Sequence, residues 1–99
     1  MQILVIGRHT EILETVVRLL NKEEKWMASG ASSDTKAIRL FDEQDPAIVL
    51  LCAGIEEESE IAIRRYCTDK NPSIVIIQHY GGGSGLLKNE ILQALSERL

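Results

Sequence analysis

Apolar runs alternate with amphipathic segments along this chain. Residues 2–6 form an apolar, β-branched run, and residues 47–52 form another that follows a proline. A weaker run, interrupted by a glycine, spans residues 26–31, and a fourth apolar run spans residues 73–78. Strands that are apolar on both faces are typical of a parallel sheet covered by helices. The runs therefore predict four strands, with the interrupted one at an edge.

Segments between and after these runs have apolar residues at helical spacing. We expect Thr10 to cap the first helix, and Ser33 or Asp34 to cap the second, which ends before Pro46. A third helix is predicted over residues 56–70. The apolar stripe of the first helix comprises Ile12, Leu13, Val16, Val17 and Leu20. That of the last helix comprises Leu87, Ile91, Leu92, Leu95 and Leu99.

This strand–helix alternation, repeated four times, predicts the α/β fold class. Right-handed crossovers between parallel strands place helices on both faces of the sheet, which gives a three-layer sandwich. A chain of 99 residues is the length of one modest domain, so residues 1–99 are expected to form a single unit.

Composition narrows the possible settings and partners. A net charge of -4 disfavours nucleic acid, because binding phosphates requires a basic patch. No apolar stretch approaches the roughly 20 residues of a membrane span, so we expect no membrane contact. The two cysteines, Cys52 and Cys67, lie in an apolar strand and a helical segment. They predict reduced thiols and a cytoplasmic location.

Several segments are similar to a known family. Residues 31–55, ASSDTKAIRLFDEQDPAIVLLCAGI, resemble the middle of a bacterial response-regulator receiver domain, where a proline-led strand carries the phosphoacceptor aspartate. MQILVIG resembles the first receiver strand, and SIVIIQHYG resembles the fourth. The resemblance implies a flavodoxin-like sheet with strand order 2-1-3-4-5 and a role in two-component signalling.

The residues at the receiver's chemical positions depart from the family pattern. A receiver holds Mg²⁺ with two acidic residues after its first strand, and those positions are Gly7 and Arg8 here. The phosphoacceptor position is Cys52, and the Ser or Thr that ends the fourth strand falls at Gln78. Phosphoryl transfer needs a cation bound by carboxylates to neutralise developing charge. The comparison therefore implies a degenerate receiver, without enzymatic activity, cofactor, metal or aspartyl phosphate.

The chain is also short for a receiver. After the fourth strand a receiver needs a helix, a strand and a closing helix, or about 35 to 40 residues with loops. Only nineteen residues, 81–99, remain here. We therefore expect the fifth strand to be missing, which leaves a sheet of four strands in the order 2-1-3-4.

Loss of the fifth strand exposes the fourth as an edge. This strand has no charge and no proline, so it is a template for pairing with another chain. The expected edge consists of Ile74, Val75, Ile76 and Ile77. We expect a homodimer, formed either by antiparallel pairing of these strands or by a swap of the last helix. A different signalling protein docked at the same edge is the third possibility.

Cys52 supports an alternative function. Ligands of α/β proteins bind beyond the carboxyl ends of the strands, where His9 and His79 are also expected. A small enzyme or a phosphoryl or redox carrier could use the Cys52 thiol, and a Cys–His group could bind a metal. The simpler interpretation is that Cys52 is a small apolar filler of the core.

A glycine-rich stretch before the last helix is a second candidate site. It consists of Gly81, Gly82, Gly83, Ser84 and Gly85. Such a stretch can bind an anion or nucleotide at a helix amino terminus. Its spacing matches neither a Walker motif nor a dinucleotide fingerprint, and a flexible connection is the simpler interpretation.

Overall fold

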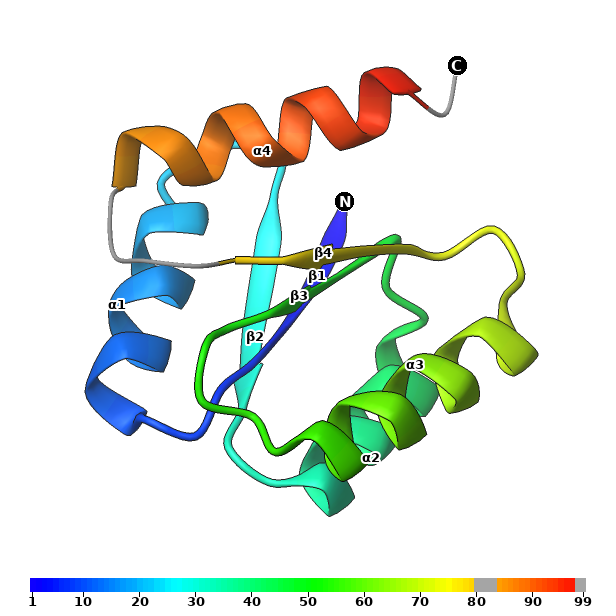
Figure 1. Cartoon of the computed structure of the whole chain (residues 1–99). Coiled ribbons are helices and arrows are strands. Elements are labelled where there is room, and N and C mark those ends of the chain that lie inside the picture. Colours follow the sequence, from blue (N-terminus) through cyan, green and yellow to red (C-terminus); the bar gives the residue numbers. More distant parts are fainter. Residues whose placement is uncertain (80–83, 98–99) are drawn as a thin grey trace.

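The computed structural model describes residues 1–79 and 84–97, in which four strands alternate with four helices (Figure 1). The strands are β1 (Gln2–Ile6), β2 (Met27–Ala31), β3 (Ile48–Leu51) and β4 (Val75–Gln78). The helices are α1 (Thr10–Leu20), α2 (Asp34–Gln44), α3 (Glu57–Lys70) and α4 (Ser84–Glu97). The predicted α/β class is confirmed.

The strands form one parallel sheet in the order β2-β1-β3-β4. Val5 of β1 pairs with Gly30 of β2 on one side and with Leu50 of β3 on the other. This order confirms the predicted 2-1-3-4 arrangement, with β2 at one edge and β4 at the other. With right-handed crossovers, this order places α1 on one face of the sheet and α2 and α3 on the other.

Helices cover both faces of the sheet, which confirms the three-layer sandwich. Figure 1 shows α2 and α3 together on one side, and α1 and α4 on the other. Ile3 and Val5 of β1 belong to the core cluster beneath α1 and α4, whereas Leu4 belongs to the cluster beneath α2 and α3. The alternation arises because successive side chains of a strand point to opposite faces. β1 and β3 are accordingly buried on both sides.

Several helix predictions need correction. Thr10 is the first residue of α1 and not its cap; His9 holds the N-cap position, with extended backbone and no capping hydrogen bond from its side chain. In α2 the cap is Ser33, one of the two predicted residues, and its Oγ accepts a hydrogen bond from the Lys36 amide. Glu56, placed in the third helix by the sequence pattern, is the N-cap residue of α3.

The apolar stripes are wider than the faces that pack. Ile12 of α1 is 49% exposed and Leu92 of α4 is 46% exposed, so neither belongs to the buried part of its predicted stripe. Each lies on the flank of its stripe, beyond the reach of the sheet. Ile91 is fully buried and Leu95 packs against the same core. The side chains of Leu87 and Leu99 lie outside the described part of the structure.

The fourth strand is shorter than residues 73–78. The amide of Ile74 donates to the carbonyl of Asn71, so the chain is still in a turn where the strand was expected to start. The third strand likewise spans Ile48–Leu51 rather than residues 47–52.

Trp26 precedes β2 and packs against the α1 side of the core. Among the described residues, no helix has the length and apolar character needed to cross a membrane.

Candidate functional site

The carboxyl end of the sheet gathers the residues that the sequence singled out. The amide of Cys52 donates to the carbonyl of Ile6, 2.8 Å away, and therefore lies beside the end of β1. Leu51 is paired with Gln78, which places Gln78 at the end of the adjacent strand β4. The carboxyl end of the sheet thus holds four of the predicted residues, as expected for residues that follow parallel strands: Gly7, Arg8, Cys52 and Gln78.

Gly7 packs tightly against Cys52. A β-carbon at position 7 would lie 3.1 Å from the β-carbon of Cys52 and 3.5 Å from its sulfur. That space holds no side chain without a shift of the neighbouring backbone or thiol. Glycine fits this close approach, and with no side chain it supplies neither of the oxygen ligands that a receiver would place here.

Arg8 occupies the space beyond the strand ends. Its Nη2 lies 2.6 Å from Oδ1 of Asp34 and 3.0 Å from Oε2 of Glu56, and its Nε also donates to the Glu56 carboxylate. Its Nη1 donates to the carbonyl of Ser32 at 3.1 Å. These groups come from the loops after β1, β2 and β3. One guanidinium therefore connects three loops, and only 20% of its side chain is exposed.

The electrostatics of this Arg8 cluster, defined as Arg8, Asp34 and Glu56, keep all three groups charged. Hydrogen bonds to Glu56 and then to Asp34 raise the pKa of Arg8. The bond from Arg8 in turn lowers the pKa of each carboxyl, and the Ser59 hydroxyl contributes to both shifts. Hydrogen bonds to the ionised form stabilise it relative to the neutral form. The two carboxylates are therefore committed to an internal cation at neutral pH.

Cys52 is buried among apolar side chains. Only 3% of its surface is exposed, and this burial raises the pKa of its thiol. The thiolate is the nucleophilic form of cysteine, and burial in apolar surroundings suppresses it. The side chain packs in the core cluster beneath α1 and α4. This environment is that of a core filler.

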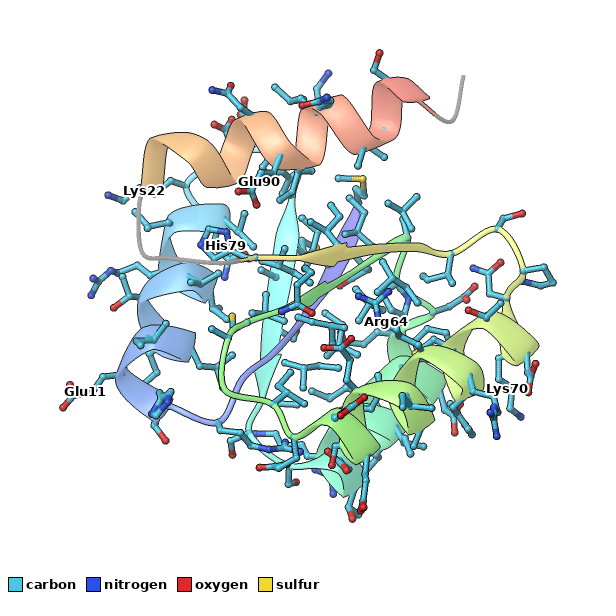
Figure 2. The ribbon with its side chains drawn as sticks, viewed as in Figure 1. Glu11, Lys22, Arg64, Lys70, His79 and Glu90 are labelled. Atoms are coloured by element: carbon cyan, nitrogen blue, oxygen red, sulfur yellow. The ribbon has the colours of Figure 1, made fainter. Side chains whose placement is uncertain are left out.

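The two histidines have other neighbours. The Nε2 of His9 lies 3.1 Å from the point where a β-carbon on Gly54 would stand, and Gly54 has a φ of +95° that favours glycine. His79 is 3% exposed, and its Nδ1 lies 3.0 Å from Oε2 of Glu90 on α4 (Figure 2). Neither histidine forms a hydrogen bond with Cys52 among the described residues. Within that same part of the chain, no group of three His, Cys, Asp or Glu residues could hold a metal.

The remaining predicted residues lie near the same end of the sheet or beyond the described part. The Nε2 of Gln78 donates to the carbonyl of Leu51 at 3.2 Å, so its amide turns back onto the sheet. Ser84 and Gly85 begin α4. Gly81, Gly82 and Gly83 lie outside the described residues.

Sequence reasoning missed the partners of Arg8. Asp34 was predicted as a possible helix cap and Glu56 as the first residue of the third helix, and neither was expected to bind Arg8. A signal was present, because each acid follows a strand that neighbours the first strand in a 2-1-3-4 order. An arginine after one strand, with carboxylates after the two neighbouring strands, predicts an ion-pair cluster at the carboxyl end of the sheet.

Solved structures that are similar to this chain identify its fold. A response regulator receiver domain protein from Clostridium thermocellum superposes with a TM-score of 0.70 and 28% identity, over 96% of this chain and 75% of that one. The chain has a receiver-domain fold. A two-component transcriptional regulator AraC from Clostridium phytofermentans ISDg gives a TM-score of 0.72 at 15% identity, over 99% of this chain and 90% of that one.

A third structure extends the likeness. The isolated REC domain of RcsB from Salmonella enterica serovar Typhimurium, in the presence of phosphomimetic BeF3-, gives a TM-score of 0.65 at 16% identity. The match covers 95% of this chain and 71% of that one. No protein-family model matches the sequence, and a search of curated proteins finds no match. The structural likeness thus establishes a receiver-type fold.

Proposed function

We propose that this receiver-type domain is a pseudo-receiver, a non-enzymatic protein-interaction module of bacterial signal transduction that is not phosphorylated on aspartate. The observation that supports the proposal most strongly is the Arg8 cluster. A receiver holds a magnesium ion after its first strand, whereas this chain places a guanidinium there, bonded to Asp34 and Glu56. We further propose that the domain acts in the cytoplasm and needs no cofactor.

Arg8 acts as an internal cation. A divalent ion needs carboxylate oxygens, and the carboxylates nearest to Arg8 already accept its hydrogen bonds. A guanidinium remains charged at every physiological pH, and its planar donors suit several acceptors at once. The fixed charge also repels a second cation. On this proposal, the two carboxylates are not available to hold the magnesium ion that aspartyl phosphorylation requires.

Cys52 offers no substitute for the missing aspartate. An acyl phosphate forms on a carboxylate, and a phosphocysteine would form on a thiolate. Burial raises the pKa of the Cys52 thiol and leaves 3% of the residue exposed. The carrier function considered above therefore receives no support from the geometry.

A domain without this switch acts through a constant surface. The three loops after β1, β2 and β3 are connected by one side chain. Such a network favours one arrangement of the loops, because moving any of them breaks a charged hydrogen bond. The module then presents the same faces to its partner at all times, and partner binding alone carries the signal.

Exposure to phosphoryl donors tests the proposal. The intact chain would be incubated with acetyl phosphate and Mg²⁺ and, separately, with beryllofluoride and Mg²⁺, beside a receiver known to be phosphorylated. Intact-mass spectrometry should detect a phosphoryl adduct on the control alone. Trp26 fluorescence should not respond to beryllofluoride. A stoichiometric acid-labile adduct on this chain would overturn the proposal.

A further inference from the structure

The two edges of the sheet differ in how their backbone groups are satisfied. In a parallel ladder, alternate residues direct N–H and C=O toward one neighbouring strand and the residues between them direct these groups away. At β2 the outward residue Ala28 is bonded by the Asn21 side chain. The Ala28 amide donates to Oδ1 at 2.8 Å, and the Asn21 Nδ2 donates to the Ala28 carbonyl at 3.2 Å. Asn21 therefore occupies the place of a further strand.

The β4 edge has no equivalent cap. The amides of Val75 and His79 donate to carbonyls of residues 47 and 51, so odd-numbered residues of β4 face β3. Ile76, between them, directs its N–H and C=O away from the sheet. Among residues 1–79 and 84–97, no hydrogen bond is seen to these two groups. An edge strand with unpaired backbone N–H and C=O groups can pair with a further strand.

The side chains of β4 are also incompletely covered. All four β4 residues are half-buried, whereas all four β3 residues are buried. Val75 and Ile77 pack against the core beneath α1 and α4, and Ile76 packs against the opposite core. Both faces of β4 thus continue the apolar layers of the sheet up to its edge. An added strand would extend both layers and cover these side chains.

We propose that a second copy of this chain adds its own β4 to this edge, antiparallel, about a two-fold axis at Ile76. Ile76 then faces Ile76 of the copy, and the two residues exchange both of their outward hydrogen bonds. Position 74 faces position 78 of the copy. The two four-stranded sheets become one continuous sheet. This inference rests on the proposed function, since it names the partner of the interaction module.

Charge does not oppose a second copy at this edge. The chain carries a net charge of -4, so two copies repel one another over most of their surfaces. Residues 71–78, with the sequence NPSIVIIQ, contain no ionisable side chain. A two-fold axis here brings identical uncharged segments together and places no like charges opposite each other. Self-pairing is thus unopposed at this edge, and an isologous contact of this kind closes as a dimer.

Light scattering after size exclusion tests the pairing on the full 99-residue chain. The molar mass should be that of a dimer across the micromolar range. Ile76→Pro removes the outward N–H and leaves the β3 ladder intact, because edge positions tolerate proline. We expect its mass to fall to that of a monomer. A chain that remains a monomer at high micromolar concentration overturns the inference.

Cysteine cross-linking tests the register, and it decides the matter if Ile76→Pro does not fold. Hydrogen-bonded antiparallel partners have Cα atoms about 5.5 Å apart, which lies within disulfide range. Ile76→Cys should therefore give covalent dimers under mild oxidation. Two controls should give no covalent dimers. They are the wild type, whose two cysteines are buried, and Asn89→Cys, at an exposed position of α4. Equal or weaker cross-linking of Ile76→Cys than of Asn89→Cys overturns the register.

The two proposals fail separately. A monomer that forms no phosphoryl adduct overturns the dimer and leaves the pseudo-receiver. A dimer that is phosphorylated overturns the pseudo-receiver and leaves the strand pairing.

Discussion

The carboxyl end of the sheet and its β4 edge treat their polar groups in opposite ways. At the carboxyl end, Arg8, which follows β1, satisfies a carbonyl and a carboxylate after β2 and a carboxylate after β3. At the β4 edge, the backbone of Ile76 faces outward, and the described residues offer it no hydrogen bond. Polar groups that already form hydrogen bonds within the chain have few donors or acceptors left for a ligand. The contrast therefore directs attention from the usual receiver pocket to the edge of the sheet.

Removing the cover of one face of β4 should have the largest effect. Ile91 of α4 is fully buried in the core that includes Val75 and Ile77. Ile91→Ala leaves a cavity there and should lower the free energy of unfolding by about 2–5 kcal/mol. Urea denaturation followed by circular dichroism measures the loss. Leu92→Ala, at the exposed neighbouring position, is the control and should change stability by less than about 0.5 kcal/mol.

Opening the capped edge should have a smaller effect. Asn21→Ala removes both side-chain hydrogen bonds to Ala28 and should cost about 1 kcal/mol. For a domain of this size, the melting temperature should fall by roughly 4–8 °C. The exposed β2 edge should also promote species larger than a dimer in light scattering. Asn89→Ala is the matched control, and an identical assembly profile for both variants would contradict the role of Asn21 as a cap.

Removing the charge of Arg8 should change the pH dependence of folding stability more than it changes the stability at neutral pH. The pKa values of Asp34 and Glu56 lie below their ordinary values of 3.8 and 4.5 in the folded chain. Their contribution is fully present above the ordinary values and is lost as pH falls through the lower, native ones. The stability difference between wild type and Arg8→Met should therefore shrink on acidification.

Thermal melts at several pH values measure this difference. Lys36→Met makes the same change in net charge outside the Arg8 cluster and serves as the control. A gap between wild type and Arg8→Met that stays constant across the acidic range would contradict the assigned pairing. Because all three side chains are partly exposed, added salt should also narrow the gap.

The smallest effect is expected at the two thiols. Burial raises the pKa of Cys52, and raises that of Cys67 to about 11. Native protein at neutral pH should therefore react with iodoacetamide at least about tenfold more slowly than protein unfolded in urea. Peptide mapping assigns the label to each thiol. Rapid native labelling of Cys52 alone would favour the carrier function over the pseudo-receiver.

Sequence patterns located the strands better than the site. Continuous apolar runs reveal strands because both faces of β1 and β3 are buried, whereas each of the four described helices carries charged residues. Cys52 and Gln78 could be placed at one edge because parallel strands end together. The strand order and the chemical meaning of these positions came from the receiver resemblance. Helix stripes overstated burial at Ile12 and Leu92, since periodicity does not give the width of the contact.

The cap and the ion pairs depended on tertiary geometry. Arg8 meets Asp34 and Glu56 only because three loops converge, across sequence separations of 26 and 48 residues. Asn21 reaches Ala28 because the turn after α1 brings it alongside β2. Propensity and periodicity describe neighbours along the chain, so neither contact is expressed in a local pattern. Both became predictable only after the strand order was known.

In the proposed dimer, Asn21 would also limit how large an assembly can grow. Two molecules joined at β4 would present only their β2 strands at the outer margins, and each margin carries its own asparagine plug at Ala28. Growth into filaments needs a free margin at every step. A single amide, placed on the far side of each molecule from the shared contact, would therefore limit the association to a finite pair.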